Sequence, residues 1–218
     1  MKRELKKRLL TSIVLLSIFF LMFFSNLFLI YIVIISSVYS LIEFSTMNNV
    51  IFIKSKFKKI INNLIFIIYL FLFSSFFILF SFTFEFKLFL FFSIIICILT
   101  DIGGFIFGKF FKGPMLTKIS PNKTVSGSIG SFLFSISFTL LILHFFAPNL
   151  PIEKFLIVAT SISLASQLGD LFFSLLKRKS GFKDTGKILP GHGGILDRID
   201  GILFGLPFGM LVLIILFK

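Results

Sequence analysis

Apolar stretches alternate with short polar ones along most of this 218-residue chain. An α-helix rises 1.5 Å per residue, so about 20 apolar residues cross the ~30 Å hydrocarbon core of a bilayer. The pattern predicts seven membrane-spanning helices, at residues 9–24, 27–42, 60–82, 88–107, 129–146, 155–176 and 202–217. The predicted fold class is therefore an all-α polytopic integral membrane protein.

The first two predicted helices belong to one apolar run that is interrupted only at Ser25 and Asn26. As a single helix, residues 9–42 would be ~51 Å long, which is far more than the core of a bilayer. We therefore expect a hairpin of two short helices, each ~24 Å long, with the bilayer thinning locally or flanking side chains snorkelling. No small-x-small cleavage site follows the basic N-terminal residues, so we expect the first helix to be retained.

The 22 Lys and Arg residues predict the orientation, because short cytoplasmic loops are enriched in these residues. With the N-terminus in the cytoplasm and seven crossings, all of them lie on the cytoplasmic side except Lys87, Lys154 and Lys218. A single crossing in the first run would place the basic segment 54–59 on the far side and lose this separation. We predict a cytoplasmic N-terminus, a C-terminus on the far side, and two polar cytoplasmic loops at 108–128 and 177–201.

Composition agrees with a membrane protein and disfavours several other classes. Charged residues make up 14% of the chain and the mean hydropathy is +1.08, whereas a soluble domain has about 25% charged residues. The net charge of +13 is scattered between apolar runs without an aromatic-interleaved patch, so we expect no nucleic-acid partner. The single cysteine, Cys97, lies in an apolar run, which leaves neither a disulfide nor a cysteine-based metal site.

Four aspartates are the first candidates for chemistry. Asp197 and Asp200 are spaced i, i+3, so a helix would bring both to one face, where Mg²⁺ would offset their repulsion. A structural alternative for the pair is a helix N-terminus, where acidic residues are favoured. Asp170 lies near the end of a predicted span, and an ionisable residue at membrane depth is by default a functional candidate, with a structural pair to a neighbouring Lys as the alternative. Asp101 precedes a Gly-Gly pair suited to close packing, so a structural role is equally well supported.

A glycine-rich turn lies beside the two C-terminal aspartates. Residues 190–194 read Pro-Gly-His-Gly-Gly, and the N–H groups of such a turn can form an anion-binding nest, with a plain loop as the alternative. His192 could donate to a phosphate or hold the turn. It has no neighbouring His or Cys with which to bind zinc.

Basic residues near the aspartates predict phosphate binding. Residues 177–184 combine a basic Lys-Arg pair at 177–178 with Lys-Asp at 183–184, as a site that holds both a polyphosphate and a metal requires. In the other polar loop, residues 120–124 read Ser-Pro-Asn-Lys-Thr, whose hydroxyls and lysine could also hold phosphate. The alternative there is an ordinary Ser-Pro turn at the start of a span.

The stretch 174–200 resembles the signature of phosphatidate cytidylyltransferases, also called CDP-diacylglycerol synthases. The matching positions are Ser174, Lys177, Arg178, Lys183, Asp184, Gly186, Leu189, Pro190, His192, Gly193, Gly194, Asp197, Arg198 and Asp200. Gln-Leu-Gly-Asp at 167–170 and the 120–124 segment are similar to further motifs of that family, with Asn122 in place of a Lys. Asp101 with its following glycines resembles another.

The resemblance implies an enzyme of phospholipid biosynthesis that joins CTP to phosphatidic acid, giving CDP-diacylglycerol and pyrophosphate. It implies that Mg²⁺ is the cofactor, held by Asp170, Asp197 and Asp200. It implies that these residues act in catalysis together with Lys177, Arg178, Lys183 and Asp184. It further implies that the substrates are bound by Ser120, Lys123, Thr124, His192, Gly193, Gly194 and Arg198, with Arg198 acting as an internal ion-pair partner or a phosphate clamp.

The resemblance also implies a multi-pass protein of the inner (plasma) membrane whose site faces the cytoplasm, among membrane lipids. Residues 1–100 would then form a scaffold of lipid-facing helices, and residues 101–218 the catalytic region that bears the motifs. The sequence leaves the oligomeric state open, a homodimer included.

Three other functions remain as alternatives. A CTP-dependent lipid kinase would use a similar helical fold, but the intact 174–200 stretch favours the cytidylyltransferase. A CDP-alcohol phosphatidyltransferase is disfavoured, because the Ala-Arg pair expected soon after Asp200-Gly201 is missing. A transporter would place its ionisable residues near the bilayer midplane, whereas Asp101 and Asp170 are predicted at span ends.

Overall fold

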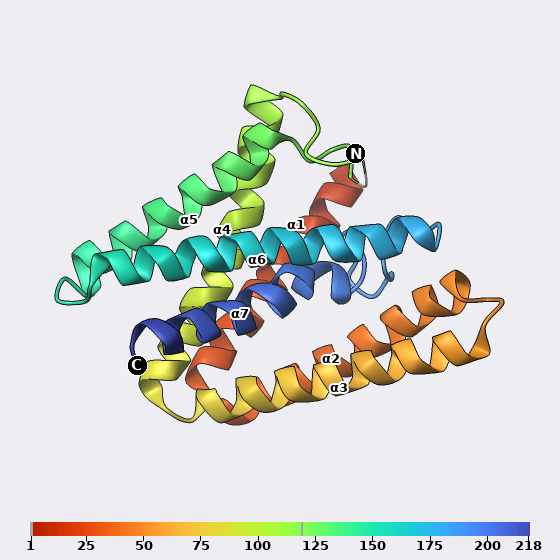
Figure 1. Ribbon diagram of the computed structural model, residues 1–218, viewed down its shortest axis with the longest axis horizontal. Coiled ribbons are helices and arrows are strands. Elements are labelled where there is room, and N and C mark those ends of the chain that lie inside the picture. The colour runs from red at the N-terminus through yellow and green to blue at the C-terminus, as the bar shows by residue number, and fades with distance from the viewer. Residues whose placement is uncertain (1, 119) are drawn as a thin grey trace. The chain divides into compact units, whose positions relative to one another are not determined.

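The structure is a computed structural model that describes residues 2–118 and 120–218, with side chains from Lys6 onward among the first residues. In this part of the chain, seven α-helices are each long and apolar enough to cross a membrane. They are α1 (Lys2–Phe24), α2 (Asn26–Ile51), α3 (Lys56–Ser81), α4 (Phe84–Phe111), α5 (Val125–Phe146), α6 (Ile152–Lys179) and α7 (Leu196–Leu216) (Figure 1). The predicted all-α polytopic fold is confirmed, and the orientation of the termini stays a prediction.

The break between the first two helices lies where the sequence predicted it. Ser25 is the N-cap of α2, with an extended backbone, and its hydroxyl accepts a hydrogen bond from the amide of Phe28 at 3.3 Å. A serine at this position supplies an acceptor to one of the orphan N–H groups of the first turn. The helices are nevertheless longer than predicted. The second one has 26 residues and continues to Ile51 instead of ending at residue 42, so the expected length mismatch does not arise.

The chain packs into two compact units. The first contains the residues up to Leu90 and Leu176–Ile199, so it holds α1, α2, α3, the start of α4, the end of α6, the start of α7 and the segment between α6 and α7. The second contains Phe91–Leu175 and Asp200–Lys218, so it holds most of α4, α6 and α7 and all of α5. This division follows packing, and the predicted functional division at residue 100 stays a prediction.

In the first unit, α2 and α3 lie side by side as a hairpin (Figure 1). The rings of Phe44 and Phe66 stack with their centroids 4.0 Å apart. Beyond them, the buried amide of Asn48 donates to the carbonyl of Lys59 at 2.9 Å and to the side chain of Asn63 at 2.7 Å. Buried polar groups with such partners are tolerated in a helix core. This explains in part why α2 continues through its polar C-terminal residues.

In the second unit, glycines bring α4 and α5 into close contact. A Cβ atom added at Gly103 would lie 2.5 Å from the carbonyl oxygen of Gly130, and one at Gly127 would lie 2.7 Å from the carbonyl oxygen of Gly104. Small residues allow such backbone approach between membrane helices. The expectation that the glycines after Asp101 serve close packing is confirmed, and this packing fixes one wall of the pocket described next.

Candidate active site

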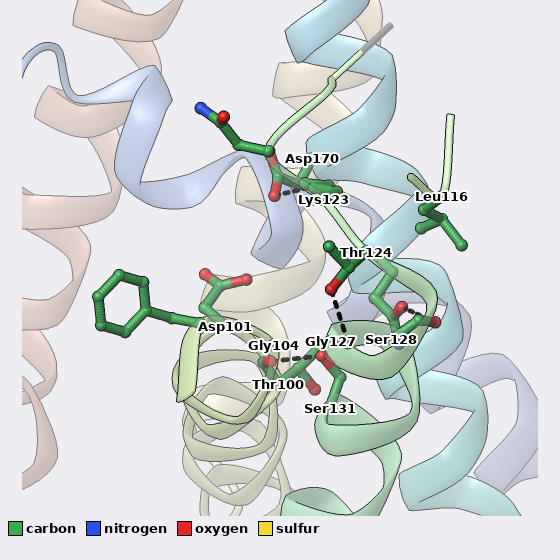
Figure 2. Close-up of a pocket in the computed structure, with 13 residues that line it drawn as sticks. Thr100, Asp101, Gly104, Leu116, Lys123, Thr124, Gly127, Ser128, Ser131 and Asp170 are labelled. Carbon is green, nitrogen blue, oxygen red and sulfur yellow. Dashed lines mark hydrogen bonds and ion pairs between the residues drawn. The ribbon is translucent and has the colours of Figure 1, made fainter. Parts of the chain in front are cut away.

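A pocket of about 250 Å³ opens in the second unit, between α4, α5, α6 and the α4–α5 loop (Figure 2). Its lining includes two aspartates, a lysine, a glutamine, an asparagine and several hydroxyls in an otherwise apolar set of helices. The lining residues are Thr100, Asp101, Gly104, Phe105, Leu116, Asn122, Lys123, Thr124, Gly127, Ser128, Ser131, Gln167 and Asp170. The pocket thus joins three of the motifs that the sequence places far apart.

The α4–α5 loop presents Lys123 to the pocket. The amide of Lys123 donates to the carbonyl of Ser120 at 3.0 Å, which closes the Ser-Pro-Asn-Lys turn, and the amide of Leu116 donates to the carbonyl of Lys123 at 2.7 Å. Thr124 then begins α5 as its N-cap, and its hydroxyl accepts from the amide of Gly127 at 3.1 Å. The segment therefore starts a helix, as the structural alternative expected, and also delivers a lysine to the pocket. Phosphate binding by this segment stays a prediction.

The ammonium group of Lys123 forms an ion pair with the carboxylate of Asp170 on α6 (Figure 2). Both side chains are about one-quarter exposed, so solutes can reach the pair. Ser174 donates to the other carboxylate oxygen of Asp170 at 3.2 Å, and the neighbouring Gln167 accepts from Ser128 at 2.6 Å. The pocket therefore holds Asp170 in a defined place beside a cation.

The pocket's donors fit Mg²⁺, which takes hard oxygen ligands and commonly binds one or two carboxylates plus substrate phosphates. Asp101 and Asp170 line the same pocket, with the oxygens of Ser128 and Gln167 nearby. Among the described residues there is no group of three or more His, Cys, Asp or Glu side chains that could hold a metal on its own. The predicted set of Asp170, Asp197 and Asp200 stays a prediction.

In the first unit, Asp197 lies at the centre of a separate polar cluster. One carboxylate oxygen accepts from the ammonium of Lys177 at 2.7 Å. The other accepts from the amides of Thr185 at 2.8 Å and Gly194 at 3.0 Å. The side chain is only 7% exposed, and Asp197 stands in the first turn of α7. Asp197 therefore also fits the structural alternative, an acidic residue in the first turn of a helix.

The polar loop, which we define as residues 180–195, has the glycine-dependent shape that the sequence predicted. Gly191 and Gly193 have φ values of 78° and 84°, in the left-handed region that other residues rarely adopt. The amide of His192 donates to Leu189 at 2.9 Å, and Arg198 donates to the carbonyl of His192 from two nitrogens, at 3.1 and 2.7 Å. Arg198 therefore clamps the turn in this structure. Phosphate binding by the turn stays a prediction.

Other predicted site residues lie around these two clusters. Arg178, Lys183 and Asp184 are exposed in the first unit. Asp200 is buried in the second unit, and its carboxylate accepts from the amide of Gly201 at 2.8 Å. The carbonyl oxygen of Asp200 would lie 2.6 Å from a Cβ atom at Gly169, so α6 and α7 pack closely at this level. The catalytic and binding roles of all four remain predictions.

Sequence reasoning missed the contacts between the polar loop and the N-terminal helices. Thr11 of α1 donates to the carbonyl of Pro190 at 2.8 Å. Glu43 of α2 is buried and accepts hydrogen bonds from Thr185, Ile195 and Leu196. A lone acidic residue at the end of an apolar run was the signal that could have identified Glu43, because an ionisable group near membrane depth needs a partner.

Together, the helices and the pocket define a polytopic membrane protein with a carboxylate–lysine pair in each of its two units. The chain belongs to the cytidylyltransferase family, whose sequence model matches residues 52–216. The family resemblance inferred from the sequence is confirmed.

Several relatives of this chain are named phosphatidate cytidylyltransferase. One from Staphylococcus haemolyticus (strain JCSC1435) is 47% identical over 117 residues, which are 53% of this chain and 45% of that protein. One from Staphylococcus saprophyticus subsp. saprophyticus is 44% identical over 124 residues, 56% of this chain and 48% of that protein. One from Staphylococcus aureus (strain COL) is 47% identical over 117 residues, with the same coverage as the first. The chain spans about half the length of the curated relatives it matches.

Proposed function

We propose that this protein transfers the cytidylyl group of CTP to phosphatidic acid, forming CDP-diacylglycerol and pyrophosphate. The observation that carries the proposal is the 47% identity to proteins named for this activity. The pocket supports it independently, because a lysine beside two aspartates suits a polyphosphate substrate better than an apolar one. The membrane-spanning helices suit a lipid co-substrate.

The proposed reaction is an in-line displacement at phosphorus. An oxygen of the phosphatidate phosphate forms a bond to the α-phosphorus of CTP, and the bond from that phosphorus to the oxygen bridging the β-phosphate breaks. Pyrophosphate leaves with that oxygen. Because the lipid brings its own nucleophile, the protein needs to contribute mainly position and compensating charge. No serine or cysteine nucleophile is required.

Lysines and arginines supply that compensating charge in our proposal. Lys123, at the mouth of the pocket, would bind a phosphate of CTP or the phosphatidate headgroup once it is released from Asp170. Lys177, Arg178 and Lys183 would do so in the first unit, where the last two are exposed. Ser120 and Thr124 would position the loop that carries Lys123.

Magnesium is the cofactor we propose, and the pocket offers Asp170 and Asp101 as its carboxylate ligands, while Asp197 and Asp200 remain predicted ligands. When bound, Mg²⁺ would neutralise negative charge on the phosphates and on the departing pyrophosphate. The residues of the chain would orient both substrates and exclude bulk water from the reacting phosphorus. Hard oxygen donors of this kind discriminate against softer metals.

We further propose that the site faces the cytoplasm at the plasma membrane. The distribution of Lys and Arg supports this orientation, and CTP is a water-soluble substrate that must reach the site from a loop side. The proposal includes no nucleic-acid partner. A homodimer is compatible with it.

The test is an assay of the detergent-purified full chain with phosphatidic acid, Mg²⁺ and CTP radiolabelled at one chosen phosphate. We expect label from the α-phosphate to enter the lipid and label from the γ-phosphate to leave as pyrophosphate. Transfer of the γ-label to a lipid alcohol would instead identify a CTP-dependent lipid kinase. Absence of label in any lipid, with protein that remains folded, would overturn the proposed function.

A further inference from the structure

We propose that Glu43 is a positioning residue for the reaction: from α2, its carboxylate holds the polar loop and the first turn of α7 in the shape that sets Asp197. This inference rests on the proposed function for its catalytic meaning. The anchoring itself rests on geometry in the first unit alone, which contains every residue involved. Residue 43 also lies outside the segment 52–216 that the family model matches.

Glu43 accepts three hydrogen bonds from the C-terminal part of the unit. One carboxylate oxygen accepts from the hydroxyl of Thr185 at 2.8 Å and from the amide of Leu196 at 2.8 Å. The other accepts from the amide of Ile195 at 3.0 Å. The side chain is buried, with the residue only 3% exposed. A buried carboxylate is costly unless it is hydrogen-bonded in this way, so these contacts define the role of the group.

These donors are groups that would otherwise lack partners. The first N–H groups of an α-helix have no acceptor within the helix. Ile195, which precedes α7, has no side-chain acceptor with which to cap it. Glu43 takes the place of a local cap from a distant part of the chain, and its negative charge also suits the positive end of the helix dipole.

Glu43 and Asp197 share the same segment of backbone. Asp197 accepts the amides of Thr185 and Gly194, whereas Glu43 accepts the hydroxyl of Thr185 and the next two amides after Gly194. Three successive N–H groups, at residues 194–196, are therefore divided between the two carboxylates. A shift of either carboxylate moves the donors of the other, so the position of Asp197 depends on Glu43.

Two glycines of the polar loop, Gly186 and Gly194, show how closely its backbone packs against the carboxylate of Glu43. A Cβ atom added at Gly186 would collide with a side-chain oxygen of Glu43, and one at Gly194 would collide with both of these oxygens and with the Thr185 hydroxyl that donates to one of them. Neither glycine has a positive φ, so the backbone conformation alone does not require glycine there. Close approach to Glu43 does require it. Both glycines belong to the stretch that resembles the family signature, which links that stretch to a residue of the N-terminal helices.

The experiment compares Glu43→Gln and Glu43→Asp in the full chain, purified in detergent. Gln keeps the size of the side chain but replaces one acceptor oxygen by an NH₂ group, which faces N–H donors. Asp keeps the charge and both acceptors but is shorter. A side chain that only fills space would favour Gln, whereas a carboxylate that gathers three donors favours Asp. Glu85→Gln, at an exposed glutamate in the first turn of α4, is the matched control.

Two readouts are measured. For Glu43→Gln we expect kcat to fall about 10- to 100-fold, with KM for CTP and for phosphatidate changed by less than about twofold. Glu43→Asp should retain more kcat than Glu43→Gln. Hydrogen exchange followed by mass spectrometry should show faster exchange in peptides covering 185–196 for Glu43→Gln only, because the amides of Ile195 and Leu196 lose an acceptor.

A second pair of variants keeps the proposal testable if Glu43→Gln does not fold. Thr185→Val removes the hydroxyl that donates to Glu43 and leaves the backbone amide that donates to Asp197. Thr139→Val, at a buried threonine of α5 whose hydroxyl donates to Ser135 at 2.8 Å, is its matched control. We expect the first to lower kcat and to speed exchange at 194–196, and the second to do neither.

The outcomes distinguish a failure of the positioning role of Glu43 from a failure of the proposed function. Unchanged exchange at 185–196 in Glu43→Gln, or a kcat for Glu43→Gln equal to or above that of Glu43→Asp, would overturn the positioning role. If the unmodified chain forms no CDP-lipid, the proposed function fails, and the exchange comparison still decides whether Glu43 holds the loop.

Discussion

Lys123 of the α4–α5 loop pairs with Asp170 of α6, so a cation expected to bind phosphate and a carboxylate expected to bind metal neutralise each other inside the pocket (Figure 2). A phosphate of the substrate would compete with Asp170 for Lys123, and Mg²⁺ would compete with Lys123 for Asp170. A polyphosphate attracts the lysine and a cation attracts the aspartate, so the two ligands should bind more favourably together than alone.

Replacing Lys123 by Met should therefore separate the two roles of the pair. We expect kcat/KM to fall about 10²- to 10³-fold, because a positive group near the phosphates is lost. Mg²⁺ alone should bind more tightly, since Asp170 no longer has an internal partner. The measurements are the labelled-CTP assay and a Mg²⁺ titration followed by calorimetry without nucleotide. Lys118→Met, at an exposed lysine of the same loop, should change neither. Weaker binding of Mg²⁺ by Lys123→Met would contradict this account.

Removing one partner of the Lys177–Asp197 pair should destabilise the protein. Both side chains are largely buried, and loss of Asp197 leaves the ammonium of Lys177 and two amides without this acceptor. Removing one partner of a buried ion pair costs about 3 to 5 kcal/mol of stability. Asp197→Ala should therefore lower the midpoint of thermal unfolding, measured by far-UV circular dichroism. The double variant Lys177→Met/Asp197→Asn should be more stable than Asp197→Ala. Equal stability of Asp197→Ala and the unmodified protein would show that the pair contributes little.

Two glycines with similar backbone conformation provide a matched test of the polar loop. Gly181 and Gly193 have φ values of 75° and 84°, so alanine carries a comparable backbone penalty of about 1 to 2 kcal/mol at either site. A Cβ atom at Gly181 would have no neighbouring atom within 4 Å, whereas one at Gly193 would lie 2.8 Å from a carboxylate oxygen of Asp197. We expect Gly193→Ala to lower kcat by about 10²-fold and Gly181→Ala to leave it nearly unchanged. The labelled-CTP assay compares them, and equal losses would show that backbone strain alone is responsible.

The predicted membrane orientation can be tested by cysteine labelling, because the chain has a single cysteine. Cys97 is buried, so Cys97→Ser gives a background without thiols. In that background we expect Lys118→Cys, in the α4–α5 loop, to react with a membrane-impermeant maleimide only after the cells are opened. Asn149→Cys, between α5 and α6, should react in intact spheroplasts. The reverse pattern would invert the topology and place the pocket loop outside.

The number of helices and the first break could be predicted because both are local properties. Apolar runs of sufficient length define spans, and Ser25 caps the helix that follows it through an amide three residues away. The glycine turn was also predictable, because the positive φ values at Gly191 and Gly193 require the residue type that the sequence shows there.

The end of α2 and the partners of Asp197 could not be predicted in the same way. Glu43 looks like the end of an apolar run until its acceptor role toward Leu196 is seen, and that contact joins residues 153 positions apart. For Asp197 the residue type indicated a metal ligand or a helix terminus. Only the fold shows that its oxygens are met by Lys177, Thr185 and Gly194.

The distance in sequence between Glu43 and its donors has a consequence for biosynthesis. Its first donor, Thr185, follows 142 residues later and its last, Leu196, follows 153 residues later. At a synthesis rate of about 5 to 20 residues per second, this interval lasts roughly 7 to 30 s. During that time the ribosome has delivered α2 but not the loop that receives its carboxylate. Until residue 196 has been synthesised, the carboxylate of Glu43 lacks these donors, so we expect α2 to take its final position only after that point.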